Sequence, residues 1–218
     1  MKWGMSMTVE EIMEEMAVLV DDEYELDTNG HIPTKVLAWL NSCSRDLTDV
    51  ARYPGRAIYN YVEGTDEIAL PDDFHRMVMR GGIWFEGDEI PEQGLDVGNR
   101  YGFRRWGNTL ILHGLDDDGE LELFYYRKIP KFTGDPDEEP VIPESFHDLY
   151  VLYAAAKHAQ SLWDEIETKT DFYREYRDRK RELEIYMMSN DTAPYPITTG
   201  RINYRKYVEE DFDTTYEE

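Results

Sequence analysis

Two segments in the first fifty residues repeat their hydrophobic side chains at the spacing of an amphipathic helix. The first opens on Thr8-Val9-Glu10-Glu11, which fits the capping box found at helix N-termini. Its hydrophobic residues then recur every three or four positions, at Val9, Ile12, Met13, Met16, Leu19 and Val20. The second follows Pro33 and has a one-sided seam of Val36, Leu40, Cys43, Leu47 and Val50. We therefore predict a helix over about residues 8–20 and a second after Pro33, with Cys43 as a small buried hydrophobe.

From Tyr53 to about Ile129 the pattern changes to the short runs that are typical of strands. The candidate strands cover residues 57–62, 67–70, 77–85, 108–115 and 119–129. Gly87-Asp88 and Asp117-Asp118-Gly119 fit tight hairpin turns. The last strand is hydrophobic on both faces for part of its length, which suits a small barrel or sandwich.

Helical spacing returns after a connector rich in proline and acidic residues, at 131–142. A third helix is predicted to open at Pro143, and its hydrophobic face comprises Phe146, Leu149, Tyr153, Ala156 and Trp163. A fourth is predicted over residues 170–188, with a stripe of Phe172, Tyr176, Leu183 and Met187. The residues that follow contain Pro194 and Pro196 and no repeated hydrophobic face. They predict an extended arm that is ordered by a partner or not at all.

These patterns predict an α+β fold in which a bundle of about four helices carries an inserted antiparallel β domain. The bundle would comprise residues 8–52 and 143–189, and the small β barrel or sandwich would comprise residues 53–132. Residues 190–218 would form the C-terminal arm.

The charge of the chain excludes several classes of protein. There are 23 Lys and Arg residues against 47 Asp and Glu residues, which gives a formal charge of −24 at pH 7. A general nucleic-acid binder needs concentrated Lys and Arg, and an anionic membrane would repel such a chain. The longest apolar run, residues 149–156, is far shorter than the ~20 residues of a membrane-spanning helix. One cysteine and an N-terminus without signal-peptide layout lead us to expect a reducing cytoplasm.

No motif in the sequence predicts a catalytic or cofactor site. The histidines are scattered and form no His-Glu-x-x-His pair: His31, His75, His113, His147 and His158. A nucleophile elbow and a phosphate-binding glycine loop are also missing from the sequence. We therefore predict a non-enzymatic protein with no cofactor.

One partial metal motif lies between the first two helices. Its matching positions are those of a calcium loop: Glu25, Asp27, Asn29, Gly30 and Ile32. The twelfth position, which should be a bidentate glutamate, is Val36. We therefore favour a helix–helix turn with Asn29 and Gly30 in the left-handed region over a metal site.

Three groups of residues are candidates for protein interfaces. Residues 99–106 mix arginine with aromatic side chains, and the candidates there are Arg100, Tyr101, Arg104, Arg105 and Trp106. A protein interface ranks first for this mixture, plain exposed surface second and nucleic-acid binding third. The fourth helix contributes Arg174, Arg177 and Arg181, and the arm contributes Tyr195, Tyr204, Tyr207 and Phe212.

The arginines of the fourth helix have acidic neighbours in sequence. Glu175, Asp178 and Glu182 are available for pairs within the helix, so a solvated or subunit-facing stripe is the default interpretation. The first helix is strongly acidic, and our hypothesis is that it complements this stripe from a neighbouring copy.

Three stretches occur in an order and spacing that resemble a known family. They are residues 69–76 (ALPDDFHR), residues 121–130 (LELFYYRKIP), and residues 140–150 (PVIPESFHDLY), which lead into Ala154-Ala155-Ala156. Together with the N-terminal helix pair, they resemble the head–tail adaptors of tailed phages, which include connector, head-completion and tail-tubular proteins. The likeness covers about residues 8–188.

The resemblance implies a virion protein of the neck or tail that is assembled in the host cytoplasm. Such adaptors form a ring, usually of twelve copies, under the portal vertex and extend the DNA channel. Their partners are the portal and the next tail or nozzle protein. Double-stranded DNA passes through the ring without specific binding, and no membrane is involved. Terminal arms of such proteins often clasp a neighbour or the portal. The alternatives are another neck or tail completion protein and, in a different class, an acidic binding module or DNA-mimic inhibitor.

Overall fold

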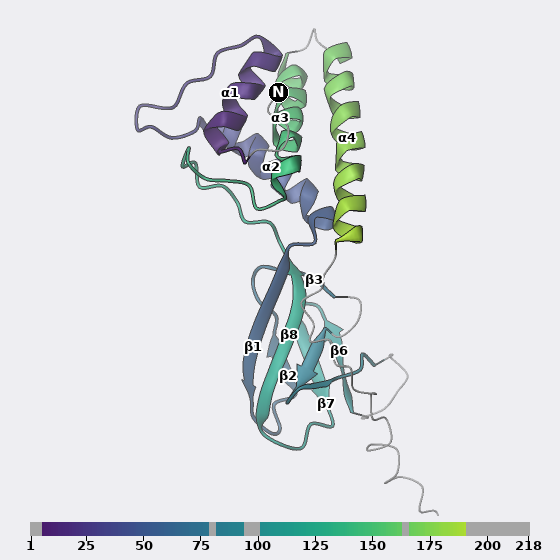
Figure 1. Cartoon of the computed structure of the whole chain (residues 1–218). Coiled ribbons are helices and arrows are strands. Elements are labelled where there is room, and N and C mark those ends of the chain that lie inside the picture. Colours follow the sequence, from purple (N-terminus) through teal and green to yellow (C-terminus); the bar gives the residue numbers. More distant parts are fainter. Residues whose placement is uncertain (1–5, 79–81, 94–100, 163–165, 191–218) are drawn as a thin grey trace, which may run out of the picture.

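The computed structural model describes residues 6–78, 82–93, 101–162 and 166–190 (Figure 1). The helices are α1 (Val9–Val20), α2 (Thr34–Ala51), a short 3₁₀-helix (Glu144–Phe146), α3 (Asp148–Ser161) and α4 (Ile166–Ser189). The strands are β1 (Pro54–Tyr61), β2 (Glu67–Ala69), β3 (Phe74–Met77), β4 (Ile83–Phe85), β5 (Asp88–Glu89), β6 (Gly102–Trp106), β7 (Thr109–His113) and β8 (Gly119–Arg127). The predicted α+β fold class is confirmed: the helices gather at one end of the molecule and the strands at the other.

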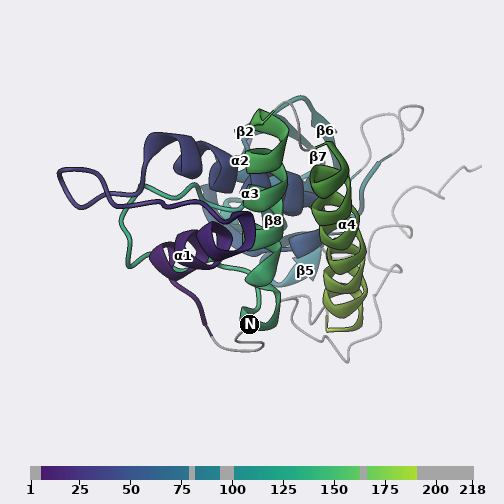
Figure 2. The ribbon, with the colours of Figure 1, turned by 90° about the horizontal axis from the view of Figure 1, so that it is seen from above.

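Helix α3 is the central element of the bundle. It contacts α1, α2 and α4, and most of its side chains are buried, among them Ala154, Ala155 and Ala156. These small side chains let neighbouring helices approach closely, because the distance between helix axes follows the size of the residues at the contact. In Figure 2, which views the molecule from above, α1 and α4 lie on opposite sides of α3.

The N-terminus of α1 is fixed by its own sequence and by the connector that precedes α3. Thr8 Oγ1 accepts a hydrogen bond from the Glu11 amide at 3.3 Å, and Glu11 Oε2 accepts one from the Thr8 amide at 3.0 Å. The predicted capping box is therefore confirmed. The Val9 amide also donates to the Glu138 carbonyl at 2.8 Å, so the connector satisfies a first-turn donor that the helix itself leaves free.

The strands form two antiparallel sheets that pack face to face. One sheet has the order β1-β8-β4-β5, with β3 also paired to β8, and the other has the order β2-β7-β6. Strand β8 is central to the first sheet and turns Leu121, Leu123 and Tyr125 toward the shared core. The second sheet contributes Leu110 and Leu112 to the same core.

Several strand predictions were wrong in detail. The predicted strand at residues 77–85 is two shorter strands, β3 and β4, and both pair with β8. No hairpin turn lies at residues 117–119, because β7 and β8 belong to different sheets. The turn between β4 and β5 is one residue earlier than predicted, at Glu86 and Gly87. Their φ angles of 48° and 86° match the doubly left-handed turn that suits the twist of a hairpin.

Two strands had no counterpart in the predictions. Strand β5 is only two residues long, and β6 contains Arg104 and Arg105, so neither has a hydrophobic run that identifies a strand. Strand β6 forms because its backbone pairs with β7 over the whole stretch Gly102–Trp106.

The hydrophobic core falls into two main clusters. One is shared by the four helices and the connector, where Ile129 and Phe132 join it, and the other lies between the two sheets. We propose on this basis that residues 8–52 and 143–189 fold as one unit and residues 53–132 as another, except that Ile129 and Phe132 pack with the bundle. The predicted arm lies outside the described residues except for Asn190.

Candidate interaction surfaces

Helix α4 is held on the bundle by a polar cluster beside its buried residues. Tyr176 is buried, and its hydroxyl donates to Asp46 Oδ2 on α2. Lys180 Nζ donates to the same carboxylate oxygen and to the Asp46 carbonyl, each at 2.8 Å. Burial acts to raise the pKa of Asp46, but the hydrogen bonds from Lys180 and Tyr176 outweigh it and leave the pKa below its ordinary value.

A second polar contact holds α4 at Arg179, one residue before Lys180. Arg179 Nε donates to Asp148 Oδ2 on α3 at 2.9 Å, and the Arg179 guanidinium lies 4.6 Å from the centre of the Phe146 ring. Asp148 is largely buried, and this burial raises its pKa even though Arg179 opposes the shift. Arg179 and Lys180 are therefore anchors of the helix and are not available to a partner.

The predicted interface arginines of α4 remain on its outer side. Arg174, Arg177 and Arg181 are all exposed, and Arg174 forms an ion pair with Asp171 at 3.3 Å. The basic stretch of this helix therefore divides into anchoring and exposed residues. The spacing could have divided it, because residue 179 lies three positions after Tyr176 and four before Leu183, both buried.

The arginine–aromatic segment of the β domain is only partly exposed. Tyr101 packs against the core between the sheets, and Arg104 is half-buried. Arg105 lies over the Phe74 ring at 5.2 Å, and Trp106 is 71% exposed. Arg105 and Trp106 therefore fit a surface role better than Tyr101 does.

The predicted interface residues are not gathered on one surface. Those of β6 lie on the β domain and those of α4 on the bundle. Arg100 and the arm residues lie outside the described part of the chain: Tyr195, Tyr204, Tyr207 and Phe212.

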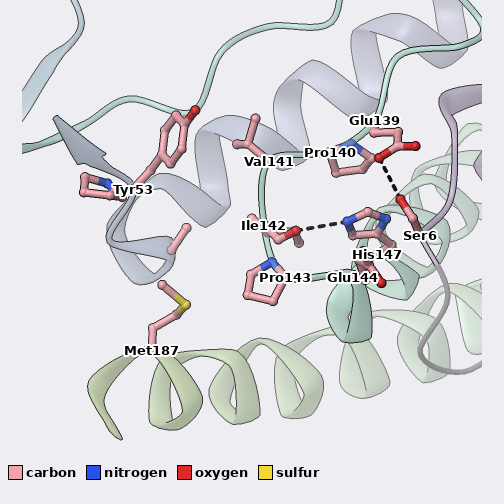
Figure 3. Close-up of a pocket in the computed structure, with 12 residues that line it drawn as sticks. Ser6, Tyr53, Glu139, Pro140, Val141, Ile142, Pro143, Glu144, His147 and Met187 are labelled. Atoms are coloured by element: carbon pink, nitrogen blue, oxygen red, sulfur yellow. Dashed lines mark hydrogen bonds between the residues drawn. The ribbon is translucent and has the colours of Figure 1, made fainter. Parts of the chain in front are cut away.

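A cavity of about 440 Å³ lies where the bundle meets the β domain (Figure 3). Tyr53 and Pro54, the connector before α3, and Met187 of α4 line it. His147 at its edge uses both ring nitrogens: Nδ1 accepts from the Met7 amide at 3.1 Å, and Nε2 donates to the Ile142 carbonyl at 3.0 Å. Because a backbone amide can only donate, this geometry requires the neutral ring. His147 therefore ties the N-terminal segment to the connector, a role that no sequence pattern indicated.

The loop that partly matches a calcium site is closed by its own backbone. Asp27 Oδ1 accepts hydrogen bonds from the Asn29 and His31 amides at 2.8 and 3.0 Å, and these bonds lower the pKa of Asp27. Gly30 has the predicted positive φ, 77°, whereas Asn29 does not, so that part of the prediction was wrong. Within the described ranges, no group of three or more His, Cys, Asp or Glu side chains could hold a metal ion.

Replacing Asp46 by asparagine is expected to lower the free energy of unfolding by about 1–2 kcal/mol at pH 7, because the charged acceptor for Lys180 is lost. The folded pKa of Asp46 is depressed, so its contribution is present above about pH 4 and lost as the pH falls through the folded pKa. Urea unfolding of wild type and variant from pH 7 to pH 2 measures this difference.

Asp49 provides the matched control for Asp46. It lies on the same helix, is 76% exposed and pairs with His75 at 2.8 Å. Asp49→Asn is expected to change the free energy of unfolding by less than about 0.5 kcal/mol at pH 7. A difference between wild type and Asp46→Asn that stays constant down to pH 2 would contradict the assignment.

The structure defines an α+β protein with exposed arginines on the outer side of α4. The sequence model of the family described as SU10 adaptor protein matches residues 7–201. The chain therefore belongs to this family of phage head–tail adaptors, as its motifs predicted. It is a phage adaptor and a virion component, and the family is one of structural proteins. No curated protein matches the chain. Within the described residues, no helix has the length and hydrophobicity needed to cross a membrane.

Proposed function

We propose that this adaptor forms a ring between the portal vertex of the filled capsid and the tail. There it extends the DNA channel and offers a platform to the next tail or nozzle protein, with twelve copies in the ring. The observation that carries the proposal is the family match, which extends over residues 7–201 of the 218-residue chain. Repeated head-to-tail contacts between identical copies close into a ring when the rotation fits, and a symmetric portal can supply that rotation.

The net charge of −24 suits this position. Acidic side chains that line a channel repel the phosphates of passing double-stranded DNA, which then moves through without binding. The same charge makes single copies repel one another until the portal holds them together. This role requires no chemical step, cofactor or membrane, and the ring would be assembled in the host cytoplasm.

Deleting residues 190–218 is expected to leave the protein folded but to impair its attachment to the portal or to a neighbouring copy. The described residues of both main hydrophobic clusters all precede Met188, so the shortened chain keeps them. Negative-stain images of the full and shortened chains, each with and without portal, test the role. Urea unfolding of both chains provides the folding control.

The images have distinct outcomes. Rings or portal caps with the full chain, and their loss with the shortened one, support both the adaptor position and the role of the arm. Equal attachment of the two chains would overturn the role of the arm. Featureless particles with the full chain and portal would overturn the proposed position.

A further inference from the structure

The bundle presents two helix faces of different charge on opposite sides. Helix α3 contacts both α1 and α4 and lies between them (Figure 2). A copy placed beside another in the same orientation therefore brings the outer face of α1 in one against the outer face of α4 in the other. Such a contact uses two different surfaces, which is the geometry that a closed ring requires.

The outer face of α1 is acidic around an exposed hydrophobic side chain. Val18 is 82% exposed, and Glu14 and Glu15 lie one turn before it on the same side. Helix α1 contains no basic residue, and no ion pair involves Glu14 or Glu15 within the described part of the chain. Glu14 and Glu15 each lie four positions after another glutamate, Glu10 and Glu11, and like charges at this spacing repel each other. A cationic partner would therefore stabilise this face.

The outer face of α4 has complementary features. Arg174, Arg177 and Arg181 follow one another at spacings of four or three residues, which places them on one side of the helix. Arg177 and Arg181 form no ion pair with any described residue. Among the described residues, Thr170, Tyr173, Arg174 and Arg177 line a depression of about 280 Å³ at this helix.

We propose that α1 of one copy docks on α4 of the next, with Val18 in the depression beside Tyr173. Glu14 and Glu15 then lie against Arg174 and Arg177. In Figure 1, α1 and the first half of α4 both lie in the upper part of the bundle, so two copies placed side by side can bring these segments together at the same height. The inference rests on the proposed ring and assigns the surfaces that form it.

The acidic residues of α4 restrict how the two helices can slide. Asp178 and Glu184 border the arginines, so α4 is not uniformly basic. If α1 moved about one turn along α4, its glutamates would lie against Asp178 and Glu184. Like charges in contact oppose binding. The mixed pattern therefore favours one register over its neighbours.

Cysteine crosslinking tests the contact directly. The full chain carries Val18→Cys and Tyr173→Cys, is assembled on the portal and is treated with a short bismaleimide. The native Cys43 is fully buried, so the introduced thiols are the accessible ones in the described part of the protein. The expected result is a ladder of crosslinked multimers on a denaturing gel. The control chain carries Val18→Cys and Ile58→Cys. Ile58 is 50% exposed but lies on β1 of the β domain, so no ladder is expected.

Charge reversal tests the pairing. Arg174→Glu with Arg177→Glu is expected to lower the assembled fraction about tenfold or more, because close charge pairs at interfaces are coupled this strongly. Adding Glu14→Arg and Glu15→Arg to the same chain should restore assembly. Reversal of Lys35 and Lys131, both exposed and outside the two faces, changes the net charge equally and is the control that should assemble normally.

The outcomes separate this inference from the proposed function. If wild-type rings form on the portal but the cysteine variant gives no ladder, the contact lies elsewhere and the ring function stands. The same conclusion follows if Glu14→Arg with Glu15→Arg fails to restore the assembly that Arg174→Glu with Arg177→Glu abolished. If the wild-type chain forms no ring with the portal, the proposed function fails and this inference fails with it.

Discussion

Replacing Tyr150 by alanine is expected to lower the free energy of unfolding by about 3–5 kcal/mol. Tyr150 is fully buried on α3, the helix that all others in the bundle contact. Its ring meets Phe132 of the connector edge-on, with centroids 5.4 Å apart, and its hydroxyl lies 3.1 Å from Ser44 Oγ on α2. Alanine removes both contacts and leaves a cavity between packed helices that can close only in part.

Urea unfolding followed by circular dichroism measures this loss. Tyr150→Phe keeps the ring and removes only the hydroxyl, so it is expected to cost about 1 kcal/mol. The comparison divides the effect between the ring and the hydrogen bond to Ser44. If Tyr150→Ala lowered the free energy of unfolding by less than Tyr150→Phe does, Tyr150 would not be part of the hydrophobic core of the bundle.

Replacing Arg179 by alanine is expected to lower the free energy of unfolding by about 2–4 kcal/mol, although Arg179 lies in a basic, solvent-facing stretch of sequence. Its guanidinium pairs with Asp148, whose side chain is only 11% exposed. Without Arg179 the buried carboxylate has lost its charged partner, which is the costly outcome for a buried ion pair. The packing of the guanidinium on Phe146 is lost as well.

Arg177→Ala is the matched control, two residues away on the same helix and exposed. It is expected to change the free energy of unfolding by less than about 0.5 kcal/mol. Burial already raises the pKa of Asp148, so in the Arg179→Ala protein the loss should shrink as the pH falls, because this carboxyl takes up a proton at a higher pH than an ordinary aspartate. Equal losses for the two alanine variants in urea would contradict the structure at α4.

The sequence predicted the helices well because their signals are local. The capping box at Thr8 and the seam from Val36 to Leu47 depend on residues three or four positions apart, and the structure shows both. Ala156, which was predicted on the hydrophobic face of the third helix, is buried. The family resemblance was available because its motifs are short continuous stretches: residues 69–76 and 140–150 lie at the ends of elements, and residues 121–130 run along β8.

The strands were predicted less well because their pairing is not local. Strand β8 pairs with β1, β3 and β4. The paired residues are 36 positions apart at Phe85–Leu121 and 72 positions apart at Pro54–Tyr126, and the other pairs fall between these values. No turn signal between β7 and β8 could show that the chain passes there from one sheet to the other. Strand β6 has no hydrophobic run of its own and exists because β7 supplies its hydrogen bonds.

The sequence by itself determined the fold class, the helices, the family resemblance and the excess of acidic charge, because each follows from composition or from short spacings. Spacing could place residue 179 on the buried side of α4, but only the tertiary structure decided which acidic groups Arg179 and Lys180 bind and which basic residues of α4 stay exposed. That division depends on Asp46 and Asp148, which lie more than 30 residues away from Lys180 and Arg179 and meet them only when α4 packs on α2 and α3. The structure also decided the role of His147, because its two hydrogen bonds join segments that are distant in the chain.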